Sequence, residues 1–294
     1  MRLGTRGSQL ALTQAGQVAE LLGGAEVVRI QTSGDGGHGD KSRWVDGLEQ
    51  ALQAGEIDMA VHSAKDLPGE LASGLELLGS PARASAEDVL CGSEDLYALP
   101  SGARVGTTSL RRVAQLRAAR DDLEIVAVSG NVDTRLRKLE EGDCEALVLA
   151  RAGLQRLGRE RHIGAILDPA VWVPAPGQGT LALEGRAGDQ DAGTAARVIT
   201  DTDTLACLRA ERSLARSLGA TCNTPLGAHA TLSGDGRLEL RAWAGLPDGS
   251  AWIGDELWGE RDDPERLGQE VAERMRLAGA DQLLETAEEL AHDT

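Results

Sequence analysis

A histidine, a lysine and an aspartate lie close together where a short predicted strand ends. The alternating run 57–61 predicts a β-strand. It leads into His62-Ser63-Ala64-Lys65-Asp66-Leu67, and Pro68 and Gly69 predict a turn there. Loops that follow strands line the ligand crevice of open α/β sheets. At such a place an aspartate beside a lysine can stay ionised, stabilise a cation or transfer a proton. A surface turn with a salt bridge is an equally good interpretation of these residues alone.

Basic residues are concentrated in the middle of an acidic chain. The chain has 294 residues and a formal net charge of −17. Its central basic residues are Arg111, Arg112, Arg117, Arg120, Arg135, Arg137, Lys138, Arg151, Arg156, Arg159 and Arg161. They form either solvated helix faces paired with Asp and Glu, or a pocket for a small polyanion. The second interpretation is chemically apt because arginine binds carboxylates through two parallel hydrogen bonds.

Three predicted strands each lead through a turn into a helix, and each brings arginine to that turn. The three segments are 102–112, 123–135 and 146–156. In the first, hydroxyl residues are expected to cap the amides of the following helix; they are Thr107, Thr108 and Ser109. The same amides, together with the helix dipole, form a site for an anion. Three such turns in succession favour an anion pocket over solvated faces alone.

The composition excludes several classes of protein. Hydrophobic residues make up 41% of the chain and charged residues 26%, as in ordinary globular proteins with two or three domains. The sequence contains no run of about 18 apolar residues that would predict a membrane span. Its N-terminal segment lacks the apolar core of a signal peptide, so we expect a cytoplasmic protein. The negative charge and the scarcity of aromatic residues (five Trp, one Tyr, no Phe) argue against nucleic-acid binding.

The four cysteines differ in their surroundings. Cys91, Cys144, Cys207 and Cys222 are far apart, and no Cys-x-x-Cys pair indicates a zinc or redox motif. In a reducing cytosol they should be free thiols, and most such cysteines are small buried hydrophobic residues. Cys222 alone lies in a predicted turn between two domains, where a thiolate can be reached. A purely structural cysteine is the alternative.

A glycine-rich loop at 33–40 contains Asp35, His38 and Asp40. These side chains could hold a metal ion, but the glycines favour plain flexibility, and we expect no metal site.

The remaining segments predict a succession of helices and strands. Helices are expected at 8–22, 44–54, 203–218 and 264–277, the first stopped by Gly23 and Gly24, and strands at 27–32, 238–244 and 250–253. The segment 174–180, with two prolines and two glycines, is either a crossing between domains or a plain linker. The last third of the chain therefore predicts a small α+β unit.

Taken together, these segments resemble the porphobilinogen deaminase (hydroxymethylbilane synthase) family. The resemblance covers nearly the whole chain and depends on the joint order of several motifs. They are Thr5-Arg6-Gly7-Ser8, His62 to Pro68, Gly106 to Arg112, Gly130-Asn131-Val132-Asp133-Thr134-Arg135, Gly177-Gln178-Gly179, and Cys222 with Pro225-Leu226-Gly227.

The resemblance implies an α/β fold with three domains. Two are periplasmic-binding-protein-like α/β domains joined by a double crossing, and the third is a small C-terminal α+β domain. We expect the first domain to comprise residues 1–81 and 177–198, the second residues 86–174, and the third residues 202–294.

The resemblance also implies a reaction. Such an enzyme deaminates porphobilinogen and joins four units head to tail on a covalently attached dipyrromethane cofactor. Water then releases hydroxymethylbilane for tetrapyrrole biosynthesis. Pyrrole rings become positively charged during this chemistry, so a carboxylate beside the ring nitrogens stabilises them and moves protons. Each ring carries an acetate and a propionate, and arginines and helix N-termini suit these carboxylates.

Site residues follow from the resemblance position by position. Asp66 is implied as the general acid and base, and Cys222 as the thioether anchor of the cofactor. The residues implied to bind the cofactor are Lys65, Thr107, Thr108, Ser109, Arg111, Arg112 and Arg135. Those implied to bind the substrate are Arg6, Ser8 and Arg156. The family further suggests a monomer.

Two departures from the family pattern keep alternatives open. The lid before the second helix is short and consists of Asp40-Lys41-Ser42-Arg43-Trp44, and Ser129 stands where the family usually has an arginine before Gly-Asn-Val. A degenerate family member could bind pyrroles without joining them. A two-domain binding protein for small polycarboxylates would share the anion pockets but would have no use for Cys222.

Overall fold

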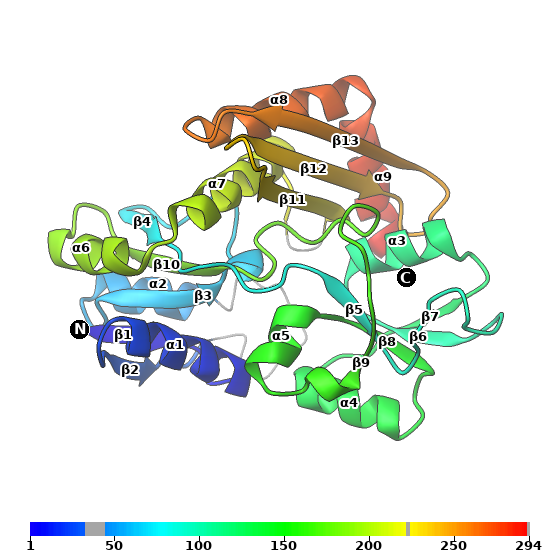
Figure 1. Cartoon of the computed structure of the whole chain (residues 1–294), viewed down its shortest axis with the longest axis horizontal. Coiled ribbons are helices and arrows are strands. Elements are labelled where there is room, and N and C mark those ends of the chain that lie inside the picture. The colour runs from blue at the N-terminus through cyan, green and yellow to red at the C-terminus, as the bar shows by residue number, and fades with distance from the viewer. Residues whose placement is uncertain (33–44, 222–223, 293–294) are drawn as a thin grey trace.

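The computed structural model describes residues 1–32, 45–221 and 224–292. For residues 291 and 292 it describes the backbone alone. Figure 1 shows two α/β lobes side by side and a third unit packed above them.

The first lobe is built on a five-stranded sheet in the order β2-β1-β3-β10-β4. Its strands are β1 (Arg2–Thr5), β2 (Glu26–Arg29), β3 (Met59–Ser63), β4 (Leu75–Gly79) and β10 (Leu181–Arg186). Its helices are α1 (Gln9–Leu21), α2 (Asp46–Gln53), α6 (Gln190–Ile199) and a 3₁₀ turn, η2 (Ala64–Asp66). β1, β2 and β3 are parallel, whereas β10 runs antiparallel to β3. Alternating strand residues pack on α1 and α6 on one face and on α2 on the other.

The second lobe repeats this plan with the order β7-β6-β8-β5-β9. Its strands are β5 (Asp88–Cys91), β6 (Arg104–Gly106), β7 (Glu124–Val126), β8 (Ala146–Ala150) and β9 (Ile163–Ile166). Its helices are α3 (Leu110–Ala119), α4 (Val132–Glu140), α5 (Arg151–Arg156) and the 3₁₀ turn η3 (Glu160–His162). Here β6, β7 and β8 are parallel and β5 is antiparallel to β8.

The two antiparallel strands reveal the double crossing. β5 follows the first lobe in the chain but belongs to the second sheet, and β10 follows the second lobe but belongs to the first sheet. The segment 174–180 is therefore a crossing and not a plain linker. This confirms the two-domain α/β architecture that the resemblance implies.

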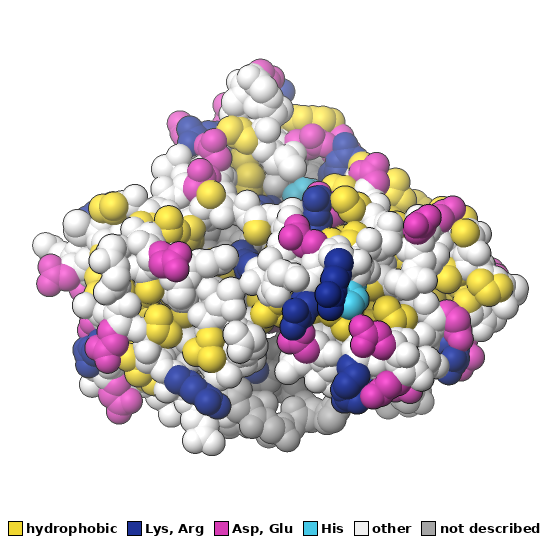
Figure 2. Space-filling view, turned by 60° about the horizontal axis from the view of Figure 1, so that its bottom comes forward, with side chains coloured by type: hydrophobic (Ala, Val, Ile, Leu, Met, Phe, Trp, Pro, Cys, Tyr) yellow, Lys and Arg dark blue, Asp and Glu magenta, His cyan; other side chains and the backbone are white. Residues whose placement is uncertain are grey.

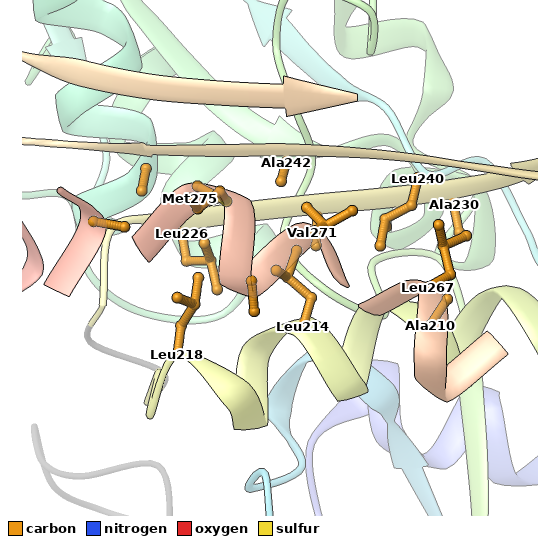
Figure 3. Packing of buried hydrophobic residues seen from close by; sticks show 14 of the residues in the cluster. Ala210, Leu214, Leu218, Leu226, Ala230, Leu240, Ala242, Leu267, Val271 and Met275 are labelled. Atoms are coloured by element: carbon orange, nitrogen blue, oxygen red, sulfur yellow. The ribbon is translucent and has the colours of Figure 1, made fainter. Parts of the chain in front are cut away.

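The third unit is a three-stranded antiparallel sheet with helices on one face. Its elements are α7 (Thr202–Ser217), β11 (Leu226–Leu232), β12 (Leu238–Gly245), β13 (Trp252–Gly259), α8 (Pro264–Leu277) and α9 (Ala280–His292). Figure 3 shows Leu214 of α7, Val271 and Met275 of α8 and Leu240 of β12 meeting in its core, where all four are fully buried. At about 25 cal/mol per Å² of apolar surface removed from water, such burial is what holds a domain this small together.

Most predicted elements are present, with shifted ends. The helix at 264–277 has the predicted bounds, whereas the strand predicted at 250–253 continues to Gly259. The sequence prediction did not identify β1, β4, β5, β9, β10, β11, α6 or α9. Buried strands such as β10 lack the alternation that reveals a half-buried strand, because both of their faces are covered.

Candidate active site

The carboxyl ends of the parallel strands in both lobes face each other. Figure 2 shows the surface hollowed between the lobe on the left and the lobe on the right. From the first lobe the turn after β3 brings Asp66, and from the second the turn after β7 leads into α4 with Arg135. The charge of Asp66 acts on the pKa of Arg135, so the two lobes bring a carboxylate and a guanidinium near each other. A switch-point crevice of this kind is where open α/β sheets bind ligands.

The backbone of the second crossing holds the turn that carries Asp66. The amide of Ala64 donates to the carbonyl of Thr180 at 3.0 Å, and the amide of Leu67 donates to the carbonyl of Ala64 at 3.2 Å. Gly177 has φ of +73°, and a Cβ placed on it would lie 2.9 Å from the Ala64 carbonyl carbon. The crossing thus contacts the 3₁₀ turn so closely that only glycine fits.

His62 does not share the turn of Lys65 and Asp66, which corrects the expectation that all three side chains enter one turn. Its Nε2 lies 2.9 Å from Oε2 of Glu184 on β10, and both side chains are buried. The reason is that β3 continues through Ser63, so strand alternation turns His62 into the interior. Lys65 and Asp66 come after the strand and are half-buried.

Arg135 and Arg156 are the two arginines best suited to a carboxylate ligand. Nε of Arg135 donates to the carbonyl of Gly130 at 2.8 Å, and Nη2 of Arg156 donates to the carbonyl of Gly179 at 2.8 Å. Burial lowers the pKa of each to about 10. Within the described chain, neither forms an ion pair with a carboxylate at 4 Å or less. A partly buried guanidinium without a counterion is stabilised by an incoming carboxylate.

Arg111 and Arg112 have a counterion of their own. Both are buried, and Oδ2 of Asp88 accepts from Arg111 Nη2 at 2.8 Å while Oδ1 accepts from Arg112 Nη2 at 2.7 Å. Burial alone would raise the pKa of Asp88, but the two guanidinium groups hold it well below its usual range. The interpretation as a solvated helix face is therefore wrong for this pair, and their contact with the cofactor stays a prediction.

The predicted hydroxyl residues differ in whether they cap a helix. Ser8 caps α1, because its Oγ accepts from the amide of Ala11 at 3.2 Å. At α3 the capping expectation is wrong, since Ser109 occupies the N-cap position and makes no capping bond with the helix. The buried Oγ1 of Thr107 instead accepts from the Ser109 amide at 3.2 Å, and Thr108 is exposed. The first-turn amides of α3 are therefore not capped by Ser109.

Several other central arginines form ion pairs with Asp or Glu, as the simpler interpretation predicts, and the pairs of Arg137 and Arg159 are solvent-exposed. The pairs are Arg120–Asp122, Arg137–Glu141, Arg151–Glu87 and Arg159–Asp133, with separations between 2.6 and 3.0 Å. The face in Figure 2 accordingly shows Lys and Arg side chains interspersed with Asp and Glu.

Cys222 and the lid 40–44 lie outside the described residues, as does the candidate metal loop with Asp35, His38 and Asp40. The other three cysteines are buried free thiols, as predicted. Burial raises the pKa of Cys91 to about 11 and that of Cys207 to about 12. A thiol with so high a pKa is a poor nucleophile.

Sequence reasoning missed four residues around the crossings. Gln178 is fully buried and donates from Nε2 to Ala86 O at 2.6 Å and Asp88 Oδ1 at 2.9 Å. Asp88, Arg83 and the buried Glu211 complete this set. An available signal was Asp88 at the head of an apolar strand, because a buried carboxylate requires cationic partners.

The part of the chain that the structure describes contains no cluster of three or more His, Cys, Asp or Glu side chains suited to a metal ion. None of its helices is long and apolar enough to span a membrane.

Comparison with known families shows which family this chain belongs to. Residues 1–194 match the family described as porphobilinogen deaminase, dipyromethane cofactor binding domain. Residues 205–276 match porphobilinogen deaminase, C-terminal domain. This chain belongs to the porphobilinogen deaminase family. The resemblance drawn from the sequence motifs is thereby confirmed.

Individual relatives are similar in sequence to this chain over nearly its full length. The porphobilinogen deaminase of Roseiflexus castenholzii is 43% identical over 299 residues, which cover 97% of this chain and 98% of the relative. That of Deinococcus deserti is 42% identical over 307 residues, 98% of each chain. Among solved structures, the VFT2 domain of Bordetella pertussis BvgS overlaps 68% of this chain and 85% of that domain with a TM-score of 0.42 and 15% identity. The methionine-binding protein MetQ overlaps 68% of this chain and 89% of its own with a TM-score of 0.44 and 14% identity.

The residues around the hollow fit a dipyrromethane. Such a group carries carboxylates on each ring, and Arg135 and Arg156 are partly buried cations without an ion pair in the described chain. Two further buried polar atoms, Arg111 Nε and Gln178 Oε1, have no hydrogen-bond partner among the described residues. A polar ligand that bonded to these two atoms would satisfy them.

Proposed function

We propose that this chain deaminates porphobilinogen and joins four units head to tail on a covalently attached dipyrromethane, releasing hydroxymethylbilane for tetrapyrrole biosynthesis. Membership of the porphobilinogen deaminase family over nearly the full chain supports this transferase over a degenerate paralogue or a polycarboxylate-binding protein. The observation in the structure that supports it best is the electrostatic interaction between Asp66, from the turn after β3 in the first lobe, and Arg135, in α4 of the second lobe.

Asp66 is proposed as the general acid and base. When bound, the dipyrromethane supplies the pyrrole carbon at which the chain of units grows. The carboxylate of Asp66 would stabilise positive charge on a neighbouring pyrrole nitrogen and carry protons to and from the reacting unit. The crossing at Gly177 fixes the position of its turn, so little reorganisation is needed when charge develops.

Arginines and hydroxyls are proposed to hold the carboxylates. The cofactor would be bound by three arginines, a lysine and three hydroxyl residues, namely Arg135, Arg111, Arg112, Lys65, Thr107, Thr108 and Ser109. The incoming substrate would be bound by Arg6, Ser8 and Arg156. The uncapped start of α3 adds the positive end of a helix dipole to this set.

Cys222 is proposed as the attachment point of the cofactor. It follows α7 by five residues, and the neighbouring Thr224 donates its amide to the carbonyl of Thr221 at 3.2 Å. The three other cysteines are buried, which disfavours each of them as the anchor.

Domain boundaries, assembly and location are proposed from the sequence. We retain 1–81 with 177–198, 86–174 and 202–294 as the three domains. We also propose that the protein acts as a cytoplasmic monomer. We propose that it does not bind nucleic acid, and the net charge of −17 supports this last point.

The intact mass of the purified chain under denaturing conditions tests the function first. We expect a mass above that of the polypeptide by two linked pyrrole units, and its loss in Cys222→Ser. Cys144→Ser is the matched control and should keep the added mass, because Cys144 is buried. A bare mass that persists after incubation with porphobilinogen and hydroxymethylbilane would contradict the proposal, as would retention of the pyrroles in Cys222→Ser.

A further inference from the structure

A second cavity lies away from the hollow, between the loop after Asp66 and the helices of the third unit. It encloses about 270 Å³ and is lined by residues of the segment 69–77, by α7 and by Glu265 at the start of α8. Arg209, Arg212 and Arg216 line it from α7. Their spacing of three and four residues places all three guanidinium groups along one face of the helix.

Arg212 is the most buried of these arginines and is only partly satisfied. Its Nη2 donates to the carbonyls of Pro68 at 2.9 Å and Gly69 at 3.0 Å. No described residue accepts a hydrogen bond from its Nε or Nη1. Burial lowers the pKa of Arg212, and the positive charge of Arg216 lowers it further. A partly satisfied, largely buried guanidinium beside a second cation is stabilised by an anion that both can bind.

The acidic side chains around the cavity do not cancel this charge. Nε of Arg209 lies 3.7 Å from a carboxylate oxygen of Glu265. The buried Glu184 and the exposed Glu70 both attract Arg212, but neither lies within ion-pair distance of it in the described structure. Arg216 forms no ion pair with any described carboxylate. Three arginines against two glutamates leave one net positive charge on the lining.

The rest of the lining is apolar. Leu71, Leu75 and Leu77 contribute side chains beside the arginines. A cavity with an apolar wall and two convergent cations suits a compact molecule that has an apolar body at one end and carboxylates at the other.

We propose that this cavity is a binding site for a small organic anion with two carboxylates on an apolar body. Arg212 and Arg216 bind the carboxylates, and the three leucines contact the body. The site is separate from the proposed catalytic set, because none of Arg6, Ser8, Asp66, Arg135 and Arg156 lines it. The binding site therefore goes beyond the proposed reaction and does not depend on it.

The position of the cavity connects it to the catalytic turn. Arg212 holds the carbonyls of Pro68 and Gly69, which follow Asp66 by two and three residues. An anion that draws the guanidinium of Arg212 toward the cavity would change these two hydrogen bonds. Ligand binding is therefore expected to alter the protection of the amides between 66 and 71.

Calorimetric titration of the complete protein with phthalate, an aromatic dicarboxylate, tests the proposal. We expect saturable binding that weakens about tenfold or more in Arg212→Gln and in Arg216→Gln. Arg209→Gln is the matched control on the same helix and should bind within about twofold of the parent, because Arg209 pairs with Glu265. Arg156→Gln reports on the hollow and should also leave this affinity unchanged.

Four results would overturn the proposal. They are the absence of saturable phthalate binding, unchanged affinity in Arg216→Gln, loss of binding in Arg156→Gln instead, and inorganic sulfate binding as tightly as phthalate. The last result would indicate a simple anion site without the apolar contact. Arg216 is exposed, so its variant should fold even if Arg212→Gln does not. Hydrogen exchange at 66–71 with and without phthalate then shows whether the site reaches the catalytic turn.

Discussion

Arg83 on the first crossing (residues 80–87, between β4 and β5) and the fully buried Glu211 of α7 form an ion pair, with 2.6 Å between Nη1 and Oε1. The same carboxylate accepts from the amide of Gly177 on the second crossing at 2.6 Å and from the amide of Ala230 on β11 at 2.7 Å. One side chain of the third unit therefore fixes both chain segments that connect the two α/β lobes.

Glu211→Gln is expected to lower the free energy of unfolding by about 3–5 kcal/mol, because it leaves the partly buried guanidinium of Arg83 without its fully buried counterion. Urea denaturation measures the change. Glu141→Gln breaks only the exposed pair with Arg137 and should cost at most about 1 kcal/mol. An equal effect of the two substitutions would contradict the role assigned to Glu211.

The stability should depend on pH in the acid range. Asp88 and Glu211 both have folded-state pKa values below their ordinary values, because Arg111 and Arg112 outweigh burial for the first and Arg83 does so for the second. A carboxyl group of this kind stabilises the fold above its unfolded pKa of about 4 and loses that contribution as the pH falls toward its folded pKa. The urea midpoint should therefore be level from about pH 7 to 5 and fall below about pH 4. A midpoint unchanged between pH 5 and pH 3 would argue against ionised buried carboxylates.

Gly177→Ala should impair both folding and turnover. Its φ is +73° and the new Cβ would meet the backbone of Ala64 and Lys65 at 2.9–3.0 Å. Gly188 is a matched control, since its φ is +78° but no atom lies within 4 Å of a Cβ there. Gly188→Ala should cost only the backbone strain, about 1–2 kcal/mol, and keep its kcat. Gly177→Ala should cost more and lower kcat about tenfold or more through displacement of Asp66. Equal kcat values in the two variants would disprove the positioning argument.

Asp66→Asn tests the proposed acid–base role. We expect an unchanged urea midpoint and a kcat lower by about 10²–10⁴, because the amide neither carries the negative charge nor exchanges the proton. Retention of the added cofactor mass in the variant separates slow chemistry from failed assembly. Turnover close to that of the parent would remove Asp66 from the mechanism.

Arg135→Gln and Arg137→Gln distinguish the two faces of α4. Arg135 interacts electrostatically with Asp66. Arg137 instead forms an exposed ion pair with Glu141 at 2.7 Å. We expect kcat/KM for porphobilinogen to fall about 10–100-fold in the first variant and to stay within about twofold in the second. Similar losses in both would favour a general charge effect over a specific carboxylate contact.

The sequence by itself determined the family and those local elements whose residues follow a clear period. Leu267, Val271 and Met275 repeat at helical spacing and lie buried in α8 as the periodicity predicts. The bounds of β8 and the stop at Gly23 also follow from short-range preferences. Capping, periodicity and turn chemistry depend on residues a few positions apart, so a single sequence carries them.

Only the tertiary structure decided which charged groups have partners. Arg111 and Arg135 are both predicted carboxylate binders, yet Arg111 pairs with Asp88, 23 residues earlier in the chain, and Arg135 keeps no ion pair among the described residues. His62 likewise pairs with Glu184 and not with its neighbours in the motif. These partners are set by strand order, because β5 and β10 enter the sheets from the opposite lobes. Contacts across a double crossing depend on the folded topology, and no local pattern of residue types encodes them.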